Sequence, residues 1–113
     1  MTRGALSLLL VSLAAPTGGP AWAQYAGVPR LEFASGCRDG AGANTAARDS
    51  CMRDEENARA KLATEWTTFA PADRTSCTQL ARLGGGGLQS YVELLTCLEM
   101  AKIAKGLPKD AKE

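Results

Sequence analysis

Apolar residues recur every three or four positions between residues 45 and 68, which predicts a long amphipathic helix. The other positions of this stretch are mostly charged or polar, as expected of a helix with faces in solvent. Glu55 interrupts the apolar stripe one turn before Arg59, so we interpret it as half of an i,i+4 ion pair, with a ligand-binding carboxylate as the alternative. The stripe comprises Ala47, Cys51, Ala58, Leu62, Trp66 and Phe69.

A proline and a run of glycines bracket the second predicted helix, residues 71–83. Pro71 suits the first helical position, where its missing N–H costs nothing, and Asp73 suits the positive end of the helix dipole. Residues 84–87 are four glycines, which are predicted to end the helix in a hinge. They do not match a P-loop, because no Lys-Ser/Thr pair follows them. The residues expected to face inward are Cys77, Leu80 and Ala81.

The third predicted helix begins with a capping box formed by Ser90 and Glu93, and Gly106 lies just beyond its end. Its interior is apolar on nearly every side, which is typical of a central core helix or of half of an interface. Leu94 and Leu98 are expected in the core. The apolar residues that point elsewhere form a candidate partner-binding strip: Val92, Leu95, Met100 and Ile103.

These patterns predict an all-α fold, in which residues 45–106 form a small three-helix domain arranged up-down-up. Residues 24–44 lack a sustained period and are predicted to be an irregular lead segment, with residues 107–113 as a frayed tail. If the lead segment packs over the strip, the apolar residues are covered within one copy and the domain is expected to be a monomer. If it does not, the exposed strip favours a homodimer or a protein partner, which is the outcome we expect. The lead residues available for packing are Val28, Leu31 and Phe33.

The four cysteines predict two disulfides. In an up-down-up arrangement, Cys77 and Cys97 lie at similar heights on adjacent antiparallel helices. Cys51 lies far from both and close to the lead segment, so we pair it with Cys37. A zinc site built from all four thiolates is the alternative, but such sites use closely spaced C-x-x-C pairs, which this chain lacks.

The beginning of the chain predicts export. Residues 1–23 combine Arg3, an apolar run of about ten residues and an A-x-A cleavage site at residues 21–23, as in a secretory signal peptide. The apolar run is shorter than the roughly 20 residues of a membrane span. Cleavage would leave Gln24 as the first residue of a periplasmic or secreted protein without a membrane span.

Charge and composition argue against several functions. Arg3 is the only charged residue in residues 1–23, so the remainder carries equal numbers of basic and acidic residues, unlike a nucleic-acid-binding protein. The chain contains no histidine, which removes the usual general acid–base and the commonest metal ligand. We therefore predict no catalytic residues, no metal and no cofactor. An enzyme would need paired carboxylates in a cleft, whereas residues 54–56 more simply solvate a helix face.

The stretch from Cys51 to Ala101 resembles an uncharacterised group of small exported four-cysteine proteins from alphaproteobacteria. The shared features are CMRDEENAR, WTTFAPADRTSC, and SYVELLTCLEMA preceded by a glycine cluster. This resemblance implies a periplasmic or secreted location and brings no activity. The stretch from Cys37 to Trp66 is also similar, more weakly, to small periplasmic proteins proposed as lysozyme inhibitors, although the spacing between its cysteines is longer.

The function predicted from the sequence is a non-catalytic structural or protein-binding module of the periplasm or exterior. The alternative is a periplasmic protein inhibitor or envelope-stress factor.

Overall fold

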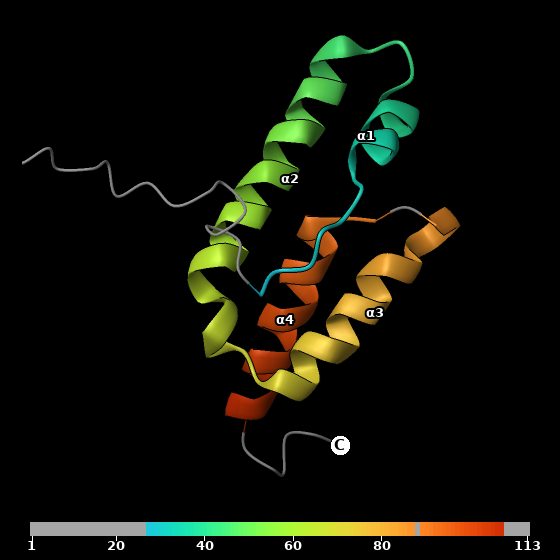
Figure 1. The fold of residues 1–113 in the computed structure, drawn as a ribbon. Coiled ribbons are helices and arrows are strands. Elements are labelled where there is room, and N and C mark those ends of the chain that lie inside the picture. Colours follow the sequence, from blue (N-terminus) through green and yellow to red (C-terminus); the bar gives the residue numbers. More distant parts are fainter. Residues whose placement is uncertain (1–26, 88, 108–113) are drawn as a thin grey trace, which may run out of the picture.

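The computed structural model of the protein describes residues 27–87 and 89–107, and these fold into helices joined by short turns (Figure 1). Within those ranges there is no β-strand, so the predicted all-α class is confirmed. The elements are α1 (Ala34–Ala41), α2 (Thr45–Glu65), the 3₁₀ turn η2 (Trp66–Thr68), α3 (Pro71–Gly87) and α4 (Tyr91–Gly106). The predicted signal peptide, residues 1–23, and all but the first residue of the predicted tail lie outside the described residues.

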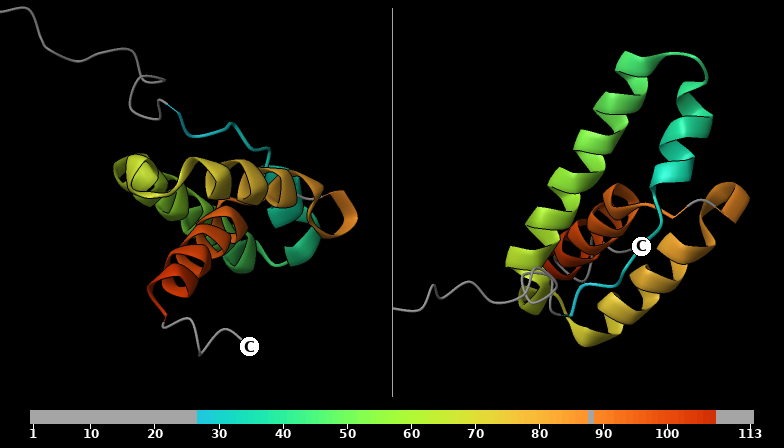
Figure 2. Two further views of the ribbon diagram at one scale, coloured as in Figure 1. Left: turned by 90° about the horizontal axis from the view of Figure 1, so that it is seen from below. Right: turned by 45° about the horizontal axis from the view of Figure 1, so that its top comes forward.

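The last helix, α4, lies at the centre of the fold. It packs against both α2 and α3, whereas α1 packs along the first half of α2 (Figures 1 and 2). The chain runs along α3 in the direction opposite to α2 and α4, which confirms the predicted up-down-up arrangement. A helix that is apolar nearly all round is stable in this position because neighbours cover two of its sides.

The helix α1 corrects the predicted irregular lead segment, so that residues 27–107, apart from residue 88, form four α-helices rather than the predicted three. Two glycines within Ala34–Ala41 give it low intrinsic helix propensity, so the local pattern does not predict it. Packing against α2 and the buried side chain of Cys37 stabilise it instead. Gly42 ends it at φ 57°, in the left-handed region that glycine adopts without strain, and donates its N–H to the carbonyl of Arg38.

The helix α3, predicted from the sequence as the second helix, also differs from its prediction at its far end. α3 continues through Gly87 rather than ending at residue 83. Glycine lowers helix propensity, but it keeps the N–H that a helical hydrogen bond needs, so a glycine run weakens a helix without forcing its end. Leu80 was expected inward and is exposed, because Cys77 and Ala81 occupy the buried face of α3.

The core forms where α2, α3 and α4 meet, and the extended lead residues close one side of it. Tyr91, Leu62, Leu94 and Leu98 are completely buried, so the predicted core positions on α4 are confirmed. The lead adds the buried Leu31. The other core members and the half-buried residues packed on them are Ala58, Trp66, Phe69, Cys77, Ala81, Val28, Phe33, Leu95 and Cys97.

Candidate functional site

Both disulfides have the predicted pairing. Cys37 joins Cys51 with 5.5 Å between their Cα atoms, and Cys77 joins Cys97 with 5.6 Å. Because every cysteine of the chain is in a disulfide, the zinc-thiolate alternative is wrong. Among the described residues, no group of three or more Cys, Asp or Glu side chains is close enough to hold a metal ion.

Glu55 is the one buried charged side chain among the described residues, with 6% of its surface exposed. Its Oε1 accepts a hydrogen bond from Ser90 Oγ at 2.6 Å, and its Oε2 accepts one from the backbone N–H of Tyr91 at 2.6 Å. A carboxylate on α2 therefore caps the beginning of α4, where the helix dipole favours negative charge. Neither sequence interpretation of Glu55, as an ion-pair partner or as a ligand contact, included this role.

The predicted capping box at the start of α4 is half confirmed. Ser90 is the N-cap, and its Oγ accepts from the N–H of Glu93 at 3.2 Å. Glu93 does not return a bond to the N–H of Ser90 within the described part of the chain. A different carboxylate, that of Glu55, accepts from the next donor, the buried N–H of Tyr91. This contact could not be predicted from the local sequence, because Glu55 lies 36 residues before Tyr91.

Tyr91 connects the lead segment to the core. Its hydroxyl accepts from the N–H of Leu31 and donates to the carbonyl of Pro29, both at 2.9 Å. Its ring meets Phe33 edge-on at 5.7 Å, and the guanidinium of Arg59 lies 5.6 Å from the ring centre. These contacts account for the hydroxyl and ring of Tyr91 as structural groups.

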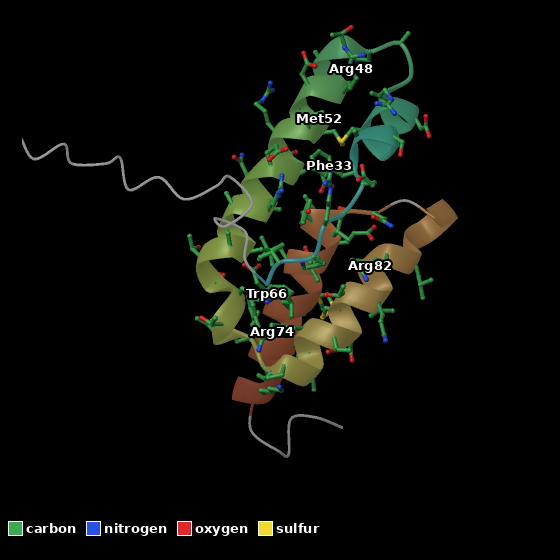
Figure 3. The ribbon with its side chains drawn as sticks, viewed as in Figure 1. Phe33, Arg48, Met52, Trp66, Arg74 and Arg82 are labelled. Atoms are coloured by element: carbon green, nitrogen blue, oxygen red, sulfur yellow. A yellow bond between two sulfur atoms is a disulfide. The ribbon has the colours of Figure 1, made fainter. Side chains whose placement is uncertain are left out.

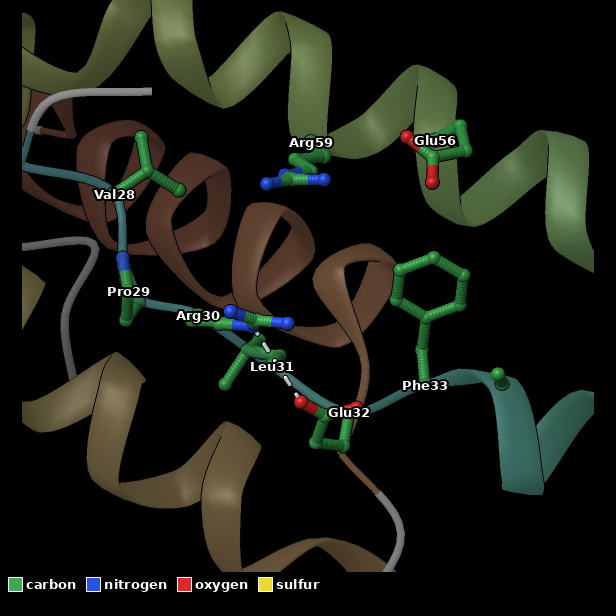
Figure 4. A pocket seen from close by; sticks show the side chains of 9 residues that line it. Val28, Pro29, Arg30, Leu31, Glu32, Phe33, Glu56 and Arg59 are labelled. Atoms are coloured by element: carbon green, nitrogen blue, oxygen red, sulfur yellow. Dashed lines mark ion pairs between the residues drawn. The ribbon is translucent and has the colours of Figure 1, made fainter. Parts of the chain in front are cut away.

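A hollow of about 340 Å³ lies between the lead segment and α2, beside Tyr91 (Figure 4). Arg30 and Glu32 form an ion pair across 3.5 Å at its edge, and both side chains are exposed. Glu56 and Arg59 of α2 lie on its opposite side. With two cations and two carboxylates, the lining has no net charge and favours neither an anion nor a cation.

A second hollow, of about 570 Å³, lies between the first residues of the lead and one face of α3. Trp66 forms its base, and the guanidinium of Arg74 lies 5.6 Å from the centre of an indole ring of Trp66 (Figure 3). Gly27 is there at φ 89°, and a Cβ at this position would come within 2.7 Å of Trp66. The lead therefore approaches the indole as closely as only a glycine allows.

The predicted strip on α4 separates into two parts. Val92, 40% exposed, and the half-buried Leu95 line a hollow of about 270 Å³ between α4 and α2. Met100 and Ile103 lie farther along α4 and are each 65% exposed. The lead packs on the Tyr91 side of the core, and the strip retains three exposed apolar side chains.

Two further apolar residues, Leu80 and Leu83 on α3, are also exposed, which the helical pattern does not predict. Helical geometry relates them to the strip. Leu80 and Leu83 follow Cys77 by three and six residues, and Met100 and Ile103 follow Cys97 by the same steps, while the disulfide turns the two cysteines toward each other. At 100° per residue, on antiparallel helices, both pairs point to the same outer side of the α3–α4 hairpin. We call Leu80, Leu83, Val92, Met100 and Ile103 the outer apolar face.

An ion pair borders this surface. Lys61 Nζ donates to Glu99 Oε1 at 2.8 Å between α2 and α4. The hydrogen bond to Glu99, followed by its charge, raises the pKa of Lys61 above its ordinary value. This edge of the surface is therefore polar and charged.

No protein-family model, curated protein or solved structure matches this chain. In the described part of the chain, none of the helices has the length and apolar character required to cross a membrane.

Proposed function

We propose that this chain is an exported, non-catalytic binding module that contacts a protein partner, or a second copy of itself, through the outer apolar face. The observation that carries the proposal is the exposure of five large apolar side chains on one side of a hairpin whose two helices are joined by Cys77–Cys97. Contiguous exposed apolar surface commonly marks an interaction site.

The disulfides support the location part of this proposal. Two disulfides are typical of an oxidising compartment such as the periplasm or the extracellular space. They also support the binding role, because a covalently fixed hairpin presents its side chains with little conformational entropy left to lose on association.

The polar groups in the core support a non-catalytic role. Glu55 is bonded to the start of α4, and the hydroxyl of Tyr91 is bonded to the lead. The two carboxylates that flank Glu55 in sequence, Asp54 and Glu56, are exposed on α2. The polar groups most deeply placed in this fold are therefore committed to holding it together.

The test is sedimentation equilibrium of the oxidised protein at micromolar concentration, together with affinity capture from a periplasmic extract. Ile103→Asp and Met100→Asp should abolish the association while changing the free energy of unfolding by less than about 0.5 kcal/mol, because both positions are exposed. Ala60→Asp is the matched control, since Ala60 is exposed on α2 away from this surface. A strictly monomeric protein that captures nothing, or association equally lost in Ala60→Asp, would refute the proposal.

A further inference from the structure

The hollow above Trp66 has the features of a binding site for a small anion. Its volume of about 570 Å³ falls within the range of small-molecule pockets. Two of the residues that line it are arginines, Arg74 and Arg82, and none is acidic. The lining also includes Trp66 and Thr78.

The two arginines share one face of α3 with a threonine between them. Arg74, Thr78 and Arg82 follow one another at intervals of four residues, so their directions differ by about 40° per step and their Cα atoms span about 12 Å along the axis. Figure 3 shows Arg74 beside Trp66 and Arg82 farther along α3. Long arginine side chains at this separation can both reach a ligand above Thr78.

The positive charge of this face is not neutralised within the described residues. Neither Arg74 nor Arg82 forms an ion pair there, and the nearest acidic residue on α3, Asp73, is paired with Lys105 of α4. Within the described part of the chain, Arg74 Nε is buried and has no hydrogen-bond acceptor.

Trp66 orients Arg74 for such a ligand. The guanidinium is held over the indole 5.6 Å from a ring centre, which limits its freedom before any ligand arrives. Guanidinium groups recognise carboxylate and phosphate oxygens through paired hydrogen bonds. We propose that this hollow binds a small organic anion, through a carboxylate or phosphate group placed between Arg74 and Arg82. This site is separate from the outer apolar face and does not depend on the function proposed for it.

The test is a titration monitored by NMR. The ¹⁵N-labelled protein is expressed from the full sequence in a Gram-negative host and purified in the form that the host exports. The probes are succinate for the carboxylate source and phenyl phosphate for the phosphate source, with the neutral succinamide and phenol as controls. Binding should shift the Nε–H signals of Arg74 and Arg82 and the indole N–H of Trp66, and it should weaken as salt concentration rises. A response to succinate alone would identify the bound group as a carboxylate, and a response to phenyl phosphate alone would identify it as a phosphate. A response to both would show that the site recognises the negative charge that the two groups share.

Arg82→Gln should weaken binding of the anion about 10-fold or more, because Arg82 is exposed and its replacement leaves the fold intact. Arg74→Gln should have an effect at least as large, and if it unfolds the protein, Arg82→Gln decides alone. Arg53→Gln is the matched control, since Arg53 is exposed on α2. Equal weakening in Arg53→Gln and Arg82→Gln, equal shifts with the neutral probes, or no shift at millimolar anion would overturn the proposal.

Discussion

At the scale of single residues, Glu55 shows how a charge within an apolar stripe can stabilise a fold. The carboxylate satisfies two donors at the start of α4, where the helix itself leaves N–H groups unpaired. These two hydrogen bonds replace those that the carboxylate would make with water, which offsets much of the free-energy cost of burying it. Because the acceptor comes from α2, the contact also fixes how α2 and α4 lie against each other.

Glu55→Gln should lower the free energy of unfolding by about 1–3 kcal/mol, because an amide can accept from only one of the two donors and leaves the other buried without a partner. Urea denaturation followed by circular dichroism measures the change. Glu56→Gln is the matched control: this neighbour is exposed and should change stability by less than about 0.5 kcal/mol. Equal stability of both variants would show that Glu55 does not cap α4.

Some single residues could be predicted from the sequence and others could not. Trp66, Leu62 and Leu98 follow helical periodicity, and all three are buried as expected. The partners of Glu55 depend on a chain reversal between α2 and α4 that no local pattern encodes. The closeness of Gly27 to Trp66 is equally a consequence of tertiary packing.

At the scale of elements, predictability follows the strength of the local signals. α2 has a long apolar period and begins, as expected, at Thr45, where the side chain of Asn44 accepts from Ala47 N–H. α4 has the Ser90 cap and begins at Tyr91. The short helix α1 lacks such signals and depends on a disulfide and on packing. The end of α3 could not be predicted, because a run of glycines lowers the stability of a helix without preventing it from forming.

The dependence of α1 on its disulfide leads to a prediction. Within the described residues α1 packs against α2 alone, and Cys37–Cys51 closes a loop of the length for which a disulfide contributes about 3 kcal/mol. Replacing both cysteines with serine should therefore abolish the hydrogen-exchange protection of α1 amides and leave the protection of α2 and α4 in the core largely unchanged.

The matched comparison is the double variant Cys77→Ser with Cys97→Ser. That bridge joins two helices of the core, so its removal should lower the stability of α2, α3 and α4 together. If the Cys37/Cys51 variant retains a protected α1, packing alone stabilises this helix. If it loses protection throughout the chain, α1 is part of the same cooperative unit as the core.

At the scale of the whole molecule, a different kind of interaction connects α4 to each of α2, α3 and the lead segment. A disulfide joins it to α3, the Glu55 carboxylate joins it to α2, and the Tyr91 hydroxyl joins it to the lead segment. One side of α4 is left without such a connection, and that side carries Met100 and Ile103. The predicted all-α fold and disulfide pairing followed from the sequence because three helices joined by short turns have few arrangements. The position of the lead did not, because it depends on Tyr91.

Two disulfides are typical of proteins in an oxidising compartment, so the last prediction concerns export. When the full chain is expressed in a Gram-negative host, intact mass spectrometry of the periplasmic fraction should find a protein that begins at Gln24 and carries two disulfides. Ala23→Asp places a charge where the peptidase requires a small residue, so this variant should accumulate as the uncleaved precursor. A variant lacking residues 2–23 should remain in the cytoplasm with reduced cysteines and, without the contribution of its disulfides, unfold at lower urea concentration. Recovery of the intact sequence from Met1 through Gln24 in the periplasm would show that residues 1–23 are not a cleaved signal peptide, and oxidised protein from the truncated variant in the cytoplasm would show that the disulfides form without export.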